Sequence, residues 1–255
     1  LAEAALVALR QTDRTKILVA RSLHPHYRDV IRTYLAQSSY QVEEFGFLAH
    51  GGLDLESLQK KLTPDVAGVI LQTPNFFGGV EDLNGVSDRV HANGSLLIVS
   101  GHPLSFALYR SPGEWGADIA AGEGQPLGMP LGFGGPYLGY FVASQSLLRR
   151  IPGRIAGLTE DTDGKRAFCL TLQAREQHIR RERAGSNICS NQALCALAAC
   201  VYMTFLGKQG MREVAELNVD RAHYLRERVA KIKGFKVDLE RPIFNEFVLH
   251  CSRPV

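Results

Sequence analysis

Cysteine is scarce in this 255-residue chain, and its positions follow no metal-binding or disulfide pattern. The five cysteines are Cys169, Cys189, Cys195, Cys200 and Cys251. Their number is odd and no two have Cys-x-x-Cys spacing, which excludes a small disulfide-stapled protein and predicts free thiols in a reducing compartment. The spacings of six and five residues between positions 189, 195 and 200 share no helical face. The sequence therefore favours small core residues over a redox or metal site there.

Long apolar runs and the common catalytic signatures are also missing. The longest apolar run, 193–206, has 14 residues including Thr204, whereas a membrane span needs about 20, so this run predicts a buried helix. The chain contains no P-loop, no H-E-x-x-H and no G-x-S-x-G, and its glycines at 122, 124 and 128 miss dinucleotide-binding spacing. A net charge of +3 is too small to indicate nucleic acid. His24 and His26 have no third ligand nearby, so we expect loop histidines facing solvent.

What the sequence does contain is an alternation of short apolar strands with amphipathic helices. Strands are predicted at Lys16–Ala20, Gln41–Phe45, Val66–Leu71 and Ser95–Val99. Helices are predicted at Leu1–Arg10, His24–Gln37, Leu55–Leu62 (with Asp54 as N-cap) and Leu83–Ala92. This alternation predicts an α/β fold whose mostly parallel sheet is covered on both faces.

Beyond residue 100 the pattern changes. The segment Gly113–Pro136 holds eight glycines in 24 residues and predicts close-packed loops. Further elements are predicted at Tyr137–Ala143 (strand), Gln192–Phe205 and Met211–Lys233 (helices) and Ile243–Cys251 (strand). A long helix followed by a new strand predicts a large domain over 1–206, then a connecting helix and the start of a smaller C-terminal α+β domain over 207–255. Because the chain opens on a leucine inside a helical pattern and stops after a strand, we expect a fragment of a longer protein.

Four sequence blocks occur in order and are distinctive together. They are QTPNFFGGVED at 72–82, PGEWGAD at 112–118, GEGQPLGMPLGFGGP at 122–136, and LQAREQHIRR at 172–181 followed by SNICSNQ at 186–192. On these blocks the chain resembles the glycine cleavage system P-protein family, and within it the N-terminal-half paralogues that form subunit 1. The resemblance covers essentially the whole chain.

The resemblance implies a fold, a reaction and a set of partners. The fold is the pyridoxal-phosphate-dependent transferase fold type I, which is aspartate-aminotransferase-like. The family reaction decarboxylates glycine and transfers the aminomethyl group to the lipoyl arm of H-protein. In the two-subunit form, subunit 2 is expected to hold the pyridoxal phosphate. The implied location is cytoplasmic, and no nucleic acid or membrane partner is expected.

A catalytic member of this family needs a lysine to form the Schiff base with the cofactor. The family's lysine precedes a glycine-rich turn ending in Gly-Gly-Pro, and the same distance counted back from 132–136 reaches Gln125. The lysines lie at 16, 60, 61, 165, 208, 231, 233 and 236, so none falls between 62 and 164. The carboxylate expected for the pyridine nitrogen is also missing, because Ser100-Gly101-His102 follows the strand there. We therefore expect no catalytic residue, no metal and no cofactor bound by this chain alone.

Five residues in that region are candidates for a vestigial site or an interface. Asn75 and Phe76 follow a buried strand, where a ligand crevice and a simple turn with Phe76 in the core are equally compatible. His102 either stacks over a ring or caps a strand end. Glu123 and Gln125 fill the loop that would carry the lysine, where packing or hydrogen bonding is favoured over catalysis.

The segment Arg149–Arg183 is basic, with nine Lys or Arg against five Asp or Glu. Helical spacing places Arg175, His178 and Arg181 on one face. This cluster would grip a phosphate, a carboxylate or the partner subunit, or it forms an internal ion network with Glu176 and Glu182. The whole segment is either a solvated salt-bridged face or a docking surface for an anionic partner.

Three hypotheses for the function follow. The first is a non-catalytic subunit 1 that supports the cofactor-bearing subunit 2 of glycine decarboxylase. The second is an enzyme in its own right that uses another lysine, of which Lys165 is the nearest candidate although it lies in a polar turn. The third is a scaffold or regulatory paralogue without a role in the glycine reaction.

Overall fold

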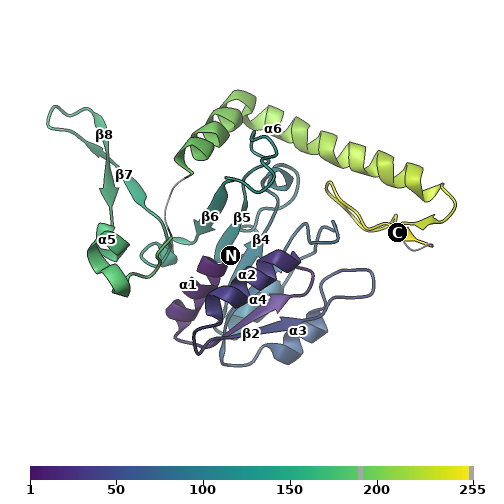
Figure 1. The fold of residues 1–255 in the computed structure, drawn as a ribbon, viewed down its shortest axis with the longest axis horizontal. Helices are drawn as coiled ribbons and strands as arrows, with labels where there is room; N and C mark the ends of the chain where they lie inside the picture. The colour runs from purple at the N-terminus through teal and green to yellow at the C-terminus, as the bar shows by residue number, and fades with distance from the viewer. Residues whose placement is uncertain (189–191, 253–255) are drawn as a thin grey trace.

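The computed structural model describes residues 1–188 and 192–252 and is an α/β structure (Figure 1). Its main sheet has six strands in the order β2-β1-β3-β4-β5-β6. These are β1 Lys16–Ala20, β2 Gln41–Phe45, β3 Val66–Gln72, β4 Leu96–Ser100, β5 Ile119–Glu123 and β6 Gly139–Ala143. The first five are parallel to their neighbours, and only β6 is antiparallel.

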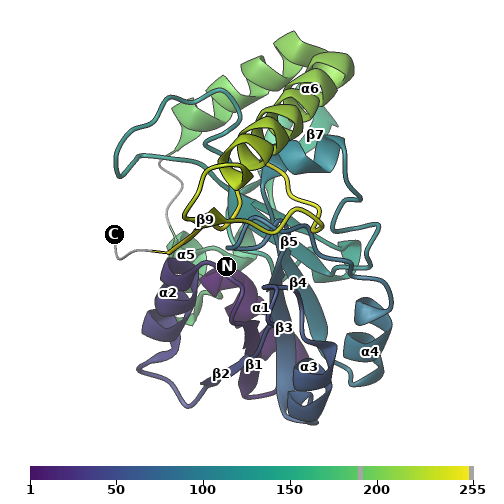
Figure 2. The ribbon, with the colours of Figure 1, turned by 90° about the vertical axis from the view of Figure 1, so that its right-hand side faces the viewer.

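Helices cover both faces of this sheet (Figure 2). They are α1 Ala2–Thr12, α2 Pro25–Leu35, α3 Leu55–Lys61 and α4 Val86–Ala92. One core cluster packs α1 and α2 on one face through residues such as Leu9, Ile17 and Ile31. A second packs α3 and α4 on the other face through Leu58 and Val90. The strands read as continuous apolar runs because both of their faces are buried.

The predicted strands and helices of the first 100 residues are confirmed, with small shifts at their ends. Asp54 caps α3 as predicted, since its carboxylate accepts a hydrogen bond from the Ser57 amide at 2.9 Å. The helix predicted from Leu83 begins instead at Val86, because Gly85 precedes it with a φ of 70°, which lies outside the helical region. His24 is half-buried rather than facing solvent, and its ring nitrogen caps α2 by accepting from the His26 amide.

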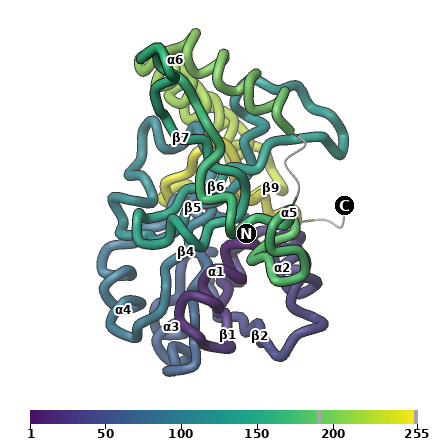
Figure 3. Tube along the Cα trace, turned by 90° about the vertical axis from the view of Figure 1, so that its left-hand side faces the viewer, coloured from purple at the N-terminus to yellow at the C-terminus, as the bar shows by residue number. Residues whose placement is uncertain are grey.

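Three parts of the chain lie outside the main sheet and the helices that cover it. An antiparallel ribbon of β7 Ile155–Glu160 and β8 Arg166–Thr171 extends away from the body (Figure 1). The long helix α6 Ala193–Ala230 lies across the end of the sheet and is kinked at Gly207 (Figures 1 and 3). The chain ends in a small two-stranded sheet of β9 Phe235–Lys236 and β10 His250–Cys251. A third core cluster joins α6 to Leu104 and Phe244.

The apolar first half of α6 corrects one prediction. The sequence predicted a buried helix over 193–206, but Leu194 is 78% exposed and Phe205 is 87% exposed. Within the described residues, one helix, α6, is long and apolar enough to cross a membrane. One such helix is weak evidence for a membrane span, because the core helix of a globular protein can have the same length and composition. The apolar face of the first half of α6 is instead left uncovered by the rest of the described chain.

Three other predictions for the chain beyond residue 100 are wrong. Cys195 is half-buried and Cys200 is exposed, so they are not core residues, while Cys189 lies outside the described residues. The strand predicted over Ile243–Cys251 is limited to β10 and an isolated bridge between Ile243 and Gly79. The glycine-rich segment, which was predicted to form loops, contains the strand β5. This strand was not predicted because the glycines around it are typical of loops.

The division into domains at 206 and 207 stays a prediction. The kink in α6 lies at this predicted boundary, where Gly207 has φ 61° and ψ −173°. The residues after it remain helical to Ala230 and return to the main body through Ile243 and Phe244, which are buried.

Candidate functional site

The strands β3, β4 and β5 end together at one edge of the sheet. Ser100 lies opposite Gln72 on one side and Ala121 on the other. In open parallel sheets, ligands bind outside this carboxyl edge. The segments that leave it carry five of the predicted residues, Asn75, Phe76, His102, Glu123 and Gln125. The topology therefore brings the predicted candidates of the first 130 residues to one edge.

Aromatic side chains and close backbone packing fill part of this edge, beside a cavity of about 500 Å³ that Gly122, Glu123 and Tyr140 help to line. The Tyr140 hydroxyl donates a hydrogen bond to the Gly101 carbonyl at 2.7 Å. A Cβ on Gly122 would lie 2.6 Å from that hydroxyl oxygen, and a Cβ on Gly101 would lie 2.4 Å from the Phe106 ring. Burial raises the pKa of Tyr140, so its phenol stays neutral and keeps the hydrogen that it donates to Gly101.

Glu123 and Gln125 fold the loop that follows β5. The Glu123 carboxylate accepts hydrogen bonds from the amides of Gln125 and Leu138 at 2.9 and 3.0 Å. The Gln125 side-chain amide donates to the Met129 carbonyl at 2.6 Å. Both side chains thus make local hydrogen bonds, as the packing interpretation expected. A neutral amide engaged in this way offers no nucleophile for a carbonyl compound.

Three lysines lie away from this loop, two of them paired with the edge strand β2 and one on the exposed ribbon. Lys16 and Lys61 both pair with Glu43 on β2, at 3.5 and 2.9 Å. Strand β2 is the edge strand, separated from β4 by β1 and β3. Lys165 lies in the turn between β7 and β8 with its side chain 77% exposed. The residues at the carboxyl edge therefore do not fit pyridoxal phosphate, since they offer neither a lysine nor a carboxylate after β4.

His102 follows β4 and packs inward. Its ring centroid lies 5.1 Å from that of Phe244, and its side chain makes no capping hydrogen bond to the short 3-10 helix Pro103–Ala107. The Nδ1 atom is buried without a hydrogen-bond partner among the described residues. Burial lowers the pKa of His102 to about 4, so the ring is neutral at pH 7. His102 thus packs against a ring of its own chain rather than capping through its side chain.

Asn75 belongs to a buried polar cluster, which accounts for all its polar atoms. Its amide donates to the Gly51 carbonyl at 2.8 Å and to the Glu81 carboxylate, and its Oδ1 accepts from the Phe77 amide. Arg241 reaches the same carboxylate at 3.1 Å. Burial raises the pKa of Glu81 despite these partners. This arrangement holds a turn together and leaves no free polar group of Asn75 for a ligand.

Phe76 is the neighbour that stays outside this cluster. It is 44% exposed, so it is not part of the core. Its ring meets the His24 ring edge-on at a centroid distance of 5.0 Å. Phe76 therefore presents an aromatic face beside the carboxyl edge.

The predicted shared face of Arg175, His178 and Arg181 does not form. The helix is broken into α5 Gln177–Arg180 and two short 3-10 turns, and Arg181 has a φ of 53°. Arg175 turns inward to the carbonyls of the 151–153 segment and pairs with Glu176 at 3.2 Å. The internal-network alternative is therefore right for this pair, while His178 and Arg181 are exposed.

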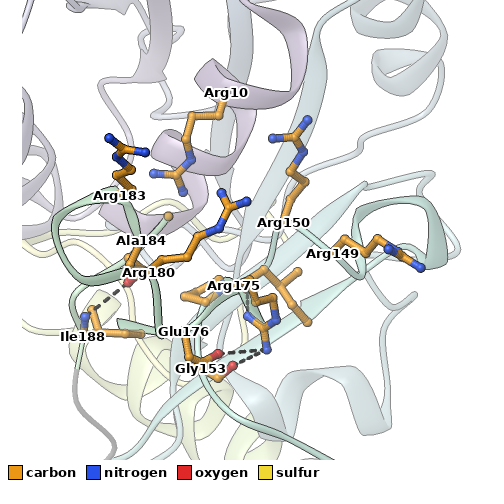
Figure 4. A pocket seen from close by; sticks show the side chains of 14 residues that line it. Arg10, Arg149, Arg150, Gly153, Arg175, Glu176, Arg180, Arg183, Ala184 and Ile188 are labelled. Atoms are coloured by element: carbon orange, nitrogen blue, oxygen red, sulfur yellow. Dashed lines mark hydrogen bonds and ion pairs between the residues drawn. The ribbon is translucent and has the colours of Figure 1, made fainter. Parts of the chain in front are cut away.

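Sequence reasoning missed a pocket lined by arginines from distant parts of the chain (Figure 4). Its volume is about 200 Å³, and its charged lining consists of Arg10, Arg149, Arg150, Arg175, Arg180, Arg183 and Glu176. The surplus of basic residues over 149–183 was a signal for five of these arginines. Nothing in the sequence pointed to Arg10, since helix α1 brings it to the pocket from the other end of the chain.

The comparisons with known proteins agree with the resemblance. A model of the glycine cleavage system P-protein matches residues 1–254. The chain belongs to this family. "Probable glycine dehydrogenase (decarboxylating) subunit 1" of Moorella thermoacetica is 53% identical over 252 residues, which cover 99% of this chain and 56% of that protein. The protein of the same name from Desulfitobacterium hafniense is 50% identical over 249 residues, which cover 98% of this chain and 56% of its own length.

Solved structures place the chain in the same P-protein family and identify the fold. A glycine decarboxylase (P-protein) structure in inhibitor-bound form matches with a TM-score of 0.93 and 40% identity, covering 99% of this chain and 56% of the other. A sphingosine-1-phosphate lyase of Burkholderia pseudomallei matches with a TM-score of 0.66, 16% identity and coverage of 95% and 54%, and shows the fold alone. The chain thus has the pyridoxal-phosphate-dependent fold type I, as expected. It spans about half the length of the P-protein relatives it matches.

Proposed function

We propose that this chain is the non-catalytic subunit 1 of a glycine decarboxylase, the P-protein of the glycine cleavage system. The observation that carries the proposal is the loop after β5, where the neutral Gln125 amide, which we take to occupy the position of the family's Schiff-base lysine, donates to the Met129 carbonyl. The identity to proteins named subunit 1 of glycine dehydrogenase supports the same assignment. The P-protein reaction, decarboxylation of glycine with transfer of the aminomethyl group to lipoylated H-protein, then takes place in the assembled complex.

Pyridoxal phosphate is assigned to subunit 2, where it would supply the electron sink for decarboxylation. The contribution of this chain is structural, because the polar side chains at its own edge are engaged in internal hydrogen bonds. We place the complex in the cytoplasm, with glycine as its substrate and with neither nucleic acid nor membrane as a partner.

Two exposed apolar surfaces support pairing with another subunit. One is the first half of α6, with Leu194, Leu197, Val201 and Phe205 at 59–87% exposed. The other is the ribbon, where Leu158 lies directly opposite Phe168 and both are 69% exposed. A two-stranded ribbon is marginally stable in water by itself, and apolar patches of this kind mark interaction surfaces.

Cofactor trapping tests the assignment. The intact protein that carries this chain is co-purified with subunit 2, loaded with pyridoxal phosphate and reduced with borohydride, and the adducts are mapped by mass spectrometry. We expect one stoichiometric adduct in subunit 2 and none on this chain. A stoichiometric adduct on Lys165 or another lysine here, lost in a Lys→Arg variant of that residue, would contradict the proposal and support an independent enzyme.

The scaffold alternative is distinguished by activity. Subunit 2 is assayed for glycine decarboxylation with and without this chain, with H-protein in both reactions. We expect activity only when both subunits are present. Full activity of subunit 2 alone would mean that this chain is a scaffold or regulator without a role in the reaction.

A further inference from the structure

The arginine pocket lies next to a larger cavity at the carboxyl end of β5, with which it shares Pro152, Gly153 and Ile188. Its lining comes from α1 (Arg10), from the segment before β7 (Arg149 and Arg150) and from α5 and the turn after it (Arg180 and Arg183). Figure 4 shows the guanidinium groups of Arg10 and Arg180 between those of Arg183 and Arg150, whereas Arg149 is directed away from them.

The arginines that converge on this pocket have few close ion-pair partners, although the Glu3 carboxylate acts on Arg10 as a counter-charge. Within residues 1–188 and 192–252, Arg10, Arg150 and Arg180 take part in no ion pair, and Arg183 only approaches Glu182 at 3.9 Å. Glu176, the one carboxylate in the lining, is already paired with Arg175.

The guanidinium of Arg10 is incompletely hydrogen-bonded within the described chain. One of its terminal nitrogens, Nη2, is buried and has no hydrogen-bond partner among the described residues. Burial lowers the pKa of Arg10, and the Arg150 charge lowers it further, while Glu3 and Tyr40 act in the opposite direction. A buried guanidinium without an acceptor is costly, and an anion bound to the atoms of Arg10 that line the pocket would offset part of that cost.

The shape of the pocket selects among anions. A volume of about 200 Å³ lies below the 300–1,000 Å³ of pockets for drug-sized ligands. Guanidinium forks that approach from several elements match a tetrahedral oxyanion, which has acceptor oxygens on every side. A single carboxylate has two oxygens and would satisfy fewer of them.

We propose that this pocket binds a phosphate group, either as inorganic phosphate or as a small phosphate monoester, held by Arg10, Arg150 and Arg180. Such a ligand would link α1 to the 149–183 segment, because it is contacted by residues from both. The site is separate from the cofactor assigned to subunit 2 and does not depend on the proposed function.

Calorimetric titration tests this site on the intact protein co-purified with subunit 2. Inorganic phosphate is titrated at constant ionic strength, with chloride as the reference anion, before and after single Arg→Gln substitutions. We expect phosphate to bind and chloride to release no heat of binding. Each of R10Q, R150Q and R180Q should weaken phosphate binding by roughly 10- to 100-fold, as loss of one charge-assisted hydrogen-bonding group predicts.

The control variant is R154Q, which removes the same charge from an exposed arginine of the same segment that does not line the pocket. We expect it to change phosphate affinity by less than about twofold. Equal losses in R154Q and R150Q would overturn the proposal and indicate only diffuse attraction by a basic surface. Absence of phosphate binding in the unsubstituted protein would also overturn it.

A second titration, with glycerol phosphate, separates the two sources of the group. Binding at least tenfold tighter than that of inorganic phosphate identifies a monoester as the ligand, whereas equal or weaker binding identifies free phosphate. Both results support the site. Glycine decarboxylation is not part of the readout, so failure of the phosphate proposal and failure of the proposed function give different results.

Discussion

Single buried polar residues fix the turns at the carboxyl edge, and Asn75 is the clearest case. Its side chain bonds to Gly51, Phe77 and Glu81, and it is 1% exposed. N75A would leave the Glu81 carboxylate and the Gly51 carbonyl without this donor inside the protein. We expect a loss of about 3 kcal/mol in the free energy of unfolding, measured by urea denaturation at pH 7. The control N84A removes an exposed amide and should cost under about 0.5 kcal/mol; an equal effect of both would contradict this role.

His102 gives a pH dependence at the same edge. Its folded-state pKa of about 4 lies below the ordinary value of 6.5. The folded state therefore binds fewer protons than the unfolded state between these values, so stability is fully present above pH 6.5 and falls as the pH drops toward 4. Between pH 7 and pH 5 this residue should remove about 2 kcal/mol from the free energy of unfolding.

The H102Q variant isolates this contribution, because glutamine is polar and does not titrate. The difference between the urea midpoints at pH 7 and pH 5 should be smaller in H102Q than in the unsubstituted protein. The control H91Q removes a histidine that pairs with Asp118 at the surface end of the sheet. An unchanged pH dependence in H102Q would show that protonation of His102 is not coupled to folding.

At the scale of elements, α6 is a helix that changes direction at one residue. Gly207 has φ 61° and ψ −173°, a conformation almost restricted to glycine, and a Cβ there would meet no atom within 4 Å. G207A therefore imposes backbone strain without a clash. We expect a cost of about 1–3 kcal/mol in unfolding free energy, measured by thermal or urea denaturation.

A matched control for that substitution lies in the same helix. Gly210 sits in the helical segment after the kink, where alanine has the higher helix propensity. G210A should change stability by less than about 1 kcal/mol in either direction, because its Cβ would lie 3.1 Å from the Leu206 Cβ. A loss in G210A as large as in G207A would argue against a required kink.

The elements also show how far the sequence determines the structure. The strands Lys16–Ala20 and Val66–Gln72 and the Asp54 cap were predictable, because apolar runs and caps are local signals that tertiary packing reinforces. Strand β5 was missed because its alanines and glycines carry weak strand propensity and its pairing with β4 and β6 is long-range.

The candidate site was also only partly predictable from the sequence. The edge position of Asn75, His102 and Gln125 followed from strand ends, which the sequence pattern locates. Their hydrogen bonds did not, since partners such as Gly51 and Met129 depend on loop geometry. The broken helix at Arg181 and the convergence of Arg10 on the basic segment also depend on tertiary folding, so spacing rules fail there.

At the scale of the whole molecule, the apolar half of α6 and the β7–β8 ribbon remain uncovered. Because burial of such surface drives association, we expect subunit 2 to cover the ribbon and the face of α6. Phe168, which lies opposite Leu158 on the ribbon, is 69% exposed. A charge at this position would be desolvated in the interface, so F168E should weaken association by roughly tenfold or more without unfolding the main sheet.

Analytical ultracentrifugation of the intact protein with subunit 2 measures this change, and hydrogen exchange of the complex locates it. Amides of the ribbon and of the first half of α6 should exchange more slowly in the complex than in the free protein. The control Y34E places the same charge on α2, where Tyr34 is 50% exposed outside both surfaces, and should leave association unchanged. Slower exchange over α2 with an unchanged ribbon, together with weaker association in Y34E, would place the interface on the α1–α2 face of the sheet instead.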